Sequence, residues 1–410
     1  MKFSFLGGAE EVGMAGILLE TPEYRFLLDY GFTPGKPPSF PRESPNIDFC
    51  LLTHAHVDHS GLIPWLCSAR GARIFATSAT QGIAEILARD NLKVSKLEGY
   101  ALPFSAADVE TMRNYYETVG FEERLELEGI DIRTHSSGHI PGSTMFEVNN
   151  GARTLITGDL NTVDSMLVEG VKPVKCDNLF IESTYAGREH PDRDELVKEF
   201  RDDVSDTAKR GGITVVPAFA VARSQEVLMM LDDLGIDLYL DGMSKRIATL
   251  FLSEGKFVRS AKKLKKALSR VKFVNNDSQR KRVLKNGGIV VTPSGMLDGG
   301  PALFYVRRIK DEEKNSVFLT GYQVEGSNGR SLLERGTMEF DGEEEKLKCS
   351  VKFFDFSAHA DHKSLIRFID DCKPETVVLY HGDKRELLAN DLSNYNVMLP
   401  KDGVDYEIND

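Results

Sequence analysis

The chain has 410 residues, which is more than one hydrophobic core usually serves, so two domains are expected. A hydrophobic fraction of 41% and a charged fraction of 28% are typical of a globular protein, and no apolar run is long enough to span a membrane. The net charge of −12 argues against indiscriminate binding to nucleic acids.

Two further features favour a cytoplasmic protein. The N-terminal stretch MKFSFLGGAEEVG contains too short an apolar run for a signal peptide. The five cysteines are widely spaced and form no Cys-x-x-Cys pair, so we expect them to be reduced residues of the core.

The first half of the chain mixes short strands with helices. Apolar runs within residues 1–60 predict four strands, in FSFLGG, AGILLE, YRFLLDYG and DFCLLTH. A helix is predicted over GLIPWLCSARG, because Pro64 stands at an early position, where a helix tolerates proline. Residues 80–118 have a mostly helical pattern, and strands return in IDIRTHSSGHIPGSTMFEV and TLITGDL.

From about residue 190 strands and helices alternate. The strand-like runs are GITVVPAFA, IDLYLDG, VKFVNN, GGIVVTPSG and SVFLTGY. Helical patterns such as RSQEVLMMLDDLG and MSKRIATLFLS separate most of them. This alternation predicts a parallel sheet covered by helices.

A basic segment interrupts the acidic chain at residues 245–285. It contains fourteen Lys and Arg and two acids, a local charge of +12 in a chain of −12. Such a segment can hold a polyanion locally. A solvated helix face explains the run KKLKK equally well, because its apolar residues have amphipathic spacing.

The stretch LLTHAHVDHSGL, residues 51–62, places three histidines and an aspartate within six positions. Other polar candidates also follow apolar strands, namely His139, Asp159, His359 and His381. Loops at strand ends converge on one edge of a sheet, so these side chains are expected to meet. Imidazole and carboxylate together suit zinc. The donors exceed one tetrahedral site and suffice for two metals about 4 Å apart, as in hydrolases of phosphate esters.

The motif THAHVDH resembles the HxHxDH signature of the metallo-β-lactamase superfamily, and the chain also has the superfamily's other motifs in order, with Asp29, His139 and Asp159. FIEST, FSAHAD and LYHGD resemble the three extra motifs of the β-CASP branch. The resemblance covers essentially the whole chain and is closest to archaeal and bacterial relatives of the endonuclease subunit of the cleavage and polyadenylation specificity factor. It implies an α/β fold, an αββα metallo-β-lactamase sandwich with an inserted α/β β-CASP domain. The expected boundaries are 1–189 and 346–410 for the metallo-β-lactamase domain and 190–345 for the β-CASP domain.

The resemblance also implies two Zn²⁺ per chain. The first zinc would be held by His54, His56 and His139, the second by Asp58, His59 and His381, with Asp159 bridging both and Asp29 orienting the histidine loop. Zinc would supply a nucleophilic water, since it lowers the pKa of bound water to about 7.

The catalytic residues that the resemblance implies are Asp58, His359 and Glu182. His359 resembles the residue that protonates the departing 3′ oxygen, with Glu182 orienting it. Histidine suits this role because its pKa is near the working pH.

Five residues are candidate RNA contacts: Arg223, Ser294, Ser327, Lys262 and Lys263. Arg223 opens a helix after a strand, a position that suits a phosphate. Ser294 and Ser327 lie in the glycine-bearing loops PSGMLDGG and EGSNGR, which could admit a close backbone approach by nucleic acid. Ordinary turn chemistry is the alternative interpretation of both loops.

These features predict a zinc-dependent ribonuclease that cleaves RNA phosphodiester bonds endonucleolytically, in RNA processing or decay. The alternatives are a 5′→3′ exoribonuclease resembling RNase J and, from another class, a non-catalytic subunit of an RNA-processing complex. The latter is disfavoured because every ligand position is filled. The expected partners are single-stranded RNA and either a second copy or related β-CASP subunits, with no membrane and with the substrate groove between the domains.

Overall fold

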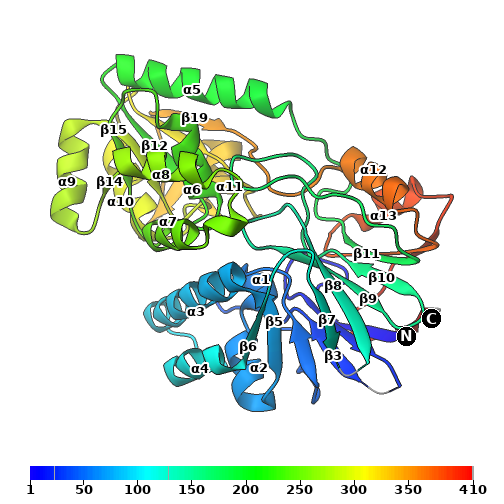
Figure 1. Ribbon diagram of the computed structural model, residues 1–410. Coiled ribbons are helices and arrows are strands. Elements are labelled where there is room, and N and C mark those ends of the chain that lie inside the picture. Colours follow the sequence, from blue (N-terminus) through cyan, green and yellow to red (C-terminus); the bar gives the residue numbers. More distant parts are fainter. Residues whose placement is uncertain (23, 128, 409–410) are drawn as a thin grey trace. The chain divides into compact units, whose positions relative to one another are not determined.

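The computed structural model describes residues 1–22, 24–127 and 129–408 (Figure 1). The chain forms two compact units. The first unit consists of Met1–Asp164, Val168–Glu189 and Ala358–Asp410, and the second of Ser165–Leu167 and His190–Ser357.

The first sheet of the first unit has seven strands in the order β22-β1-β2-β3-β4-β5-β6. Their bounds are Asp405–Glu407, Lys2–Gly7, Gly16–Glu20, Arg25–Leu28, Phe49–Leu51, Arg73–Thr77 and Tyr116–Val119. The strands β1 to β3 pair antiparallel, and β3 to β6 pair parallel. The four predicted N-terminal strands are therefore confirmed.

The second sheet also has seven strands, in the order β21-β20-β11-β10-β9-β8-β7. Their bounds are Asn396–Met398, Thr376–Tyr380, Asn178–Glu182, Arg153–Ile156, Thr144–Asn149, Ile130–Ser136 and Arg124–Leu127. Apolar residues of both sheets share one core, in which the ring centroids of Phe3 and Phe180 lie 4.9 Å apart. The two sheets thus pack face to face.

Helices cover the outer faces of this sandwich. The helices α2 (Ile63–Arg70), α3 (Ser78–Glu98) and α4 (Ala106–Thr111) pack on the first sheet, and α12 (His362–Cys372) and α13 (Arg385–Asn390) pack on the second. The predicted αββα architecture is therefore confirmed. Pro64 lies in the first turn of α2, as predicted. The helical pattern of residues 80–118 extends too far, because Tyr116–Val119 pairs with β5 as an edge strand.

The second unit contains a six-stranded sheet in the order β14-β13-β15-β12-β16-β19, in which every pair is parallel. The strands span Lys272–Phe273, Leu238–Leu240, Gly288–Thr292, Ile213–Pro217, Ser316–Leu319 and Ser350–Phe353. The predicted parallel sheet is confirmed.

Helices lie on both faces of the parallel sheet. The core of one face includes residues of α5 (Arg193–Lys209), α6 (Arg223–Leu231) and α7 (Ser244–Ser253), and α8 (Ala261–Arg270) packs there. The core of the other includes residues of α9 (Asp277–Asn286), α10 (Gly300–Ile309) and α11 (Asn328–Arg335). A hairpin of β17 (Thr337–Phe340) and β18 (Glu343–Lys346) joins this second face. None of the described helices combines the length and apolarity needed to cross a membrane.

A buried histidine of the first unit makes its stability depend on pH. The two ring nitrogens of His135 each lie 3.0 Å from a carboxylate oxygen, one of Glu122 and one of Glu147. Burial lowers the pKa of His135, but the two carboxylates outweigh burial and raise it above its usual value.

The two ion pairs of His135 should therefore stabilise the fold fully below the pKa of an unfolded histidine, about 6.5. This stabilisation should be lost as pH rises through the raised pKa of His135 in the folded protein. His135→Gln should lower Tm by a few degrees near neutral pH, and this difference should shrink toward alkaline pH. Thermal unfolding of both proteins across this range is the measurement. A difference that grows with pH would contradict the assignment.

Candidate metal centre

The histidine loop starts where β4 ends, and the end of β3 supports it. The Asp29 carboxylate accepts hydrogen bonds from the backbone N–H and the hydroxyl of Thr53, both 2.7 Å long. The same carboxylate lies 2.7 Å from Nδ1 of His59. At Gly31 a Cβ atom would lie 2.0 Å from the backbone of Asp58, so only glycine fits beside the loop. Asp29 thus contacts both ends of the histidine loop, at Thr53 and at His59.

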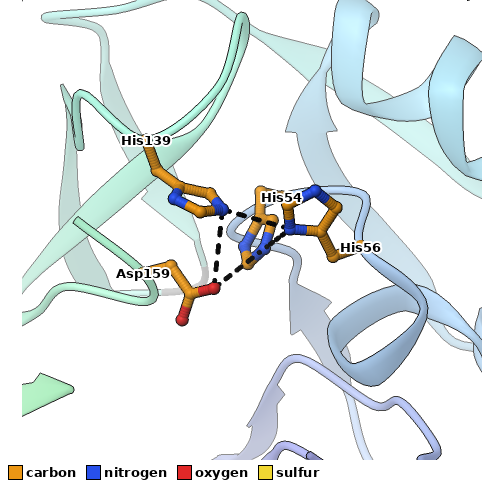
Figure 2. A group of neighbouring side chains, drawn as sticks. All are labelled: His54, His56, His139 and Asp159. Carbon is orange, nitrogen blue, oxygen red and sulfur yellow. Dashed lines mark hydrogen bonds and ion pairs between the residues drawn. The ribbon is translucent and has the colours of Figure 1, made fainter. Parts of the chain in front are cut away.

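A first donor group joins His54, His56, His139 and Asp159 (Figure 2). Nδ1 of His56 lies 3.1 Å from Nε2 of both His54 and His139. Oδ2 of Asp159 lies 3.3 Å from Nε2 of His54 and 3.6 Å from that of His139. Zinc with bonds of 2.0–2.2 Å needs donor-to-donor edges of about 3.3–3.6 Å in a tetrahedron. The two distances to Asp159 fall within this range, and the two distances of 3.1 Å between imidazole nitrogens are slightly shorter, so the spacing is close to that of a tetrahedral zinc site.

A second donor group joins Asp58, His59 and His381. Nε2 of His381 lies 3.6 Å from Oδ2 of Asp58, and Nε2 of His59 lies 3.9 Å from the same oxygen. Oδ1 of Asp159 lies 3.4 Å from Nε2 of His59 and 3.8 Å from Nε2 of His381. Asp159 thus presents one carboxylate oxygen to each group.

The polar atoms of the second group indicate that a cation belongs there. Among the described residues, Nε2 of His59, Oδ1 of Asp159 and both ring nitrogens of His381 are buried without a hydrogen-bond partner. Buried polar atoms nearly always have such a partner in folded proteins. Imidazole nitrogens and a carboxylate oxygen that converge in this way are the donor set that suits zinc.

The remaining ring nitrogens fix the orientation of the imidazoles. Nδ1 of His139 lies 2.8 Å from the carbonyl oxygen of Ala358, which can only accept, so Nδ1 carries the proton and Nε2 has a free lone pair. Nδ1 of His54 lies 3.1 Å from the hydroxyl of Thr53. Partners of this kind hold ligating histidines in place.

The electrostatics keep two of the first three imidazoles neutral, which is the form that binds metals. Burial, reinforced by His54, lowers the pKa of His56 to about 3. Burial and then His359 lower the pKa of His139 well below its usual value. Burial would raise the pKa of Asp159, but His59 and His54 outweigh it and hold that pKa well below the usual range.

His359 and Glu182 stand beside the first donor group. Nδ1 of His359 lies 2.9 Å from Oε1 of Glu182, and its Nε2 lies 4.0 Å from Oδ2 of Asp159. The buried Glu182 also accepts hydrogen bonds from the backbone N–H groups of Leu160 and Thr184. Burial lowers the pKa of His359, but Glu182 and Asp159 outweigh it and raise the pKa to about 9. Glu182 thus holds His359 beside the carboxylate shared by both donor groups.

Two site residues adopt backbone conformations that side chains disfavour. Asp29 has a φ of 60° and His381 a φ of 53°. The backbone N–H of His381 donates to the carbonyl oxygen of Gly8, and its carbonyl accepts from the hydroxyl of Thr184. Such conformations persist only where the surroundings enforce them, and they concentrate at functional sites.

The five candidate RNA contacts all belong to the second unit. Arg223 is buried, and its guanidinium lies 3.1 Å from the Glu226 carboxylate. Ser327 caps α11 by accepting a hydrogen bond from the backbone N–H of Arg330. Ser294 is half-buried between β15 and α10, and Lys262 and Lys263 are exposed on α8. The hydroxyl of Ser327 and the guanidinium of Arg223 therefore already have partners within the protein.

Two supports of the site were not predicted from the sequence. Thr53 links Asp29 to His54, and its place directly before the first histidine is a signal that could have identified it. The carbonyl oxygen of Ala358 fixes His139 from a segment 219 positions away. A backbone carbonyl has no sequence signature, so only the structure identifies it.

Comparisons with known proteins identify the family of the chain. Three family models match the chain: the metallo-beta-lactamase superfamily over residues 16–211, the Beta-Casp domain over 224–332 and the Zn-dependent metallo-hydrolase RNA specificity domain over 344–400. A crystal structure of a protein of unknown function from Enterococcus faecalis V583 is similar in fold, with a TM-score of 0.63, 13% identity and 99% of each chain covered.

Curated relatives match almost the whole chain. Probable RNase MJ4 of Methanocaldococcus jannaschii is 34% identical over 96% of each chain. RNase aCSPSF2 of Saccharolobus solfataricus is 35% identical over 94% of this chain and 80% of its own. The chain therefore belongs to the β-CASP branch of the metallo-β-lactamase superfamily.

Proposed function

We propose that this protein is a ribonuclease that uses two zinc ions to hydrolyse internal phosphodiester bonds of RNA. The observation that carries this proposal is the pair of donor groups that share Asp159, with His359 beside them. Two-metal centres are typical of enzymes that cleave phosphate esters. The names of the relatives, both RNases, and the RNA specificity domain support RNA as the substrate.

The two donor groups support a proposed set of ligands. One zinc would be bound by His54, His56 and His139, the other by Asp58, His59 and His381, and Asp159 would contact both. Zinc in such a site activates water as a nucleophile and stabilises charge on phosphoryl oxygens.

The other residues hold and move protons. Asp29 and the carbonyl oxygen of Ala358 keep His59 and His139 in the orientation that points Nε2 into the site. Glu182 holds Nδ1 of His359, so Nε2 of His359 is the atom left to donate a proton. In the proposed role this proton goes to the 3′ oxygen as its bond to phosphorus breaks.

Metal analysis tests the two-ion proposal. Mass spectrometry of zinc-saturated protein should give about two zinc ions per chain, since the donors form two groups. A saturated preparation with one ion or none would contradict it. Removing the metals with a chelator should lower Tm, because the buried donors then lose their partners.

The mode of cleavage is tested with RNA in circular form and with RNA labelled at either end. An endonuclease should linearise the circle. It should also shorten both end-labelled RNAs to labelled fragments that are longer than a mononucleotide. Intact circles together with mononucleotides released only from the 5′ end would instead indicate a 5′→3′ exoribonuclease. No cleavage of any RNA by zinc-loaded protein would contradict the proposed function itself.

A further inference from the structure

The basic segment 245–285 divides between the two faces of the parallel sheet. Helix α8 contacts α6 and α7, and its Leu268 packs on the core of that face. Helix α9 contacts α10, and its Val283 belongs to the core of the opposite face. The local charge of +12 therefore forms two separate surfaces on the second unit.

Of these two surfaces, the outer face of α8 carries the higher density of positive charge. Its sequence AKKLKKALSR contains no acid. Leu264 and Ala267 are buried, whereas four lysines are exposed: Lys262, Lys263, Lys265 and Lys266. In the part of the chain that the structure describes, none of these four forms an ion pair. By contrast, the nearby Arg270 and Lys272 pair with Asp232 and Asp237 at 3.7 and 2.7 Å.

The stability of the helix does not explain these lysines. Lys262 and Lys266 are four positions apart on one face, where like charges repel. Lys262 and Lys263 lie in the first turn, where the helix dipole disfavours cations, and Ser260 makes no side-chain cap. In the same unit α5 follows the opposite pattern, with a capping Asp192 and acids in its first turn. Lys263 contacts Sδ of Met166 at 3.9 Å, but a neutral sulfur leaves its charge uncompensated. The charges of α8 thus do not favour its folding, which is consistent with a role in binding a polyanion.

We propose that the exposed face of α8 binds the phosphate backbone of single-stranded RNA, independently of base sequence. This inference rests on the proposed ribonuclease function and assigns a part of its RNA-binding surface. Lysine ammonium groups act as point charges on phosphates and carry no base specificity. With no acid on the helix, a polyanion gains attraction along the whole face.

The test measures RNA affinity against salt for the full chain. Each phosphate neutralised in single-stranded RNA contributes about −0.7 to the slope of log affinity against log salt. Exchanging Lys262, Lys263, Lys265 and Lys266 for Gln should make the slope shallower by up to about 3 and weaken binding to different sequences alike. If this variant melts early, Lys262→Gln with Lys266→Gln should still shift the slope by about 1.4 at most.

A matched control removes four positive charges from the opposite face. It exchanges Lys281, Arg282, Lys285 and Lys346 for Gln and should change the slope much less. Equal shifts in both variants, or an α8 variant with the parent slope, would overturn the inference. If the unsubstituted protein binds RNA and the α8 variant alone has the shallower slope, but no RNA is cleaved, the proposed function is overturned and the inference stands. If the unsubstituted protein binds no RNA, both are overturned.

Discussion

Replacing Asp159 by alanine is expected to lower the zinc content from about two ions per chain to below one and to reduce RNA cleavage by far more than about 10²-fold. The reason is geometric. One oxygen of Asp159 lies 3.3 Å from Nε2 of His54, and the other lies 3.4 Å from Nε2 of His59. A single substitution therefore removes a donor from both groups. Removing a residue that only supports a ligand costs about 10–100-fold, so a shared ligand should cost more.

Two further substitutions calibrate this result. The zinc content and cleavage rate of Asp29→Asn should lie between those of the parent and of Asp159→Ala. Asp29 supports His59 through a 2.7 Å contact but contributes to neither donor group. Asp371→Ala removes an exposed carboxylate of α12 and should retain both ions. Zinc content and cleavage rate are measured for all three. Two retained ions and full activity in Asp159→Ala would exclude a shared ligand.

The strands that lead into the site were predictable because their sequences are apolar and end in polar ligands. The run DFCLLTH contains the buried β4, and TVVLY forms the mostly buried β20 directly before His381. Parallel pairing of β20 with β11 then places His381 and Glu182 at the same sheet edge. His381 and Glu182 thus come together because each follows or ends a strand at the same edge of the sheet. The contact of His139 with the Ala358 carbonyl depends instead on tertiary packing.

Other features depend on contacts with residues outside the local sequence pattern, so the pattern alone does not reveal them. The strand β18, sequence EEEK, has no apolar periodicity and exists through pairing with β17, whose Met338 and Phe340 are buried. Arg223 has the expected position at the start of α6, yet its guanidinium pairs with the buried Glu226 one turn later, which also pairs with the half-buried Arg193. The division of the basic segment between two faces follows from the strand order, in which β14 lies at one edge.

Replacing His359 by alanine should leave both zinc ions bound while turnover falls by about 10²-fold or more, the scale for losing a general acid. Nδ1 of His359 lies 2.9 Å from Glu182, and its Nε2 lies 4.0 Å from the shared Asp159, farther than Nε2 of His54, His59, His139 and His381. Loss of zinc in this variant would make His359 a ligand. His190→Ala, a histidine of the second unit that lies 3.5 Å from Asp355, is the matched control and should behave as the parent.

The chemistry of the leaving group separates proton donation from a structural role. A phosphodiester with an acidic aryl alcohol needs no proton as its bond to phosphorus breaks, so His359→Ala should lose much less activity on it than on RNA. Glu182→Gln should show the same pattern in weaker form, because His359 remains but loses the carboxylate that orients Nδ1 and favours its protonated form. Glutamine also places an amide near the backbone N–H groups of Leu160 and Thr184, so zinc content must be measured alongside. Equal losses on RNA and on the aryl ester, with zinc retained, would mean that His359 positions the substrate and that the proton comes from elsewhere.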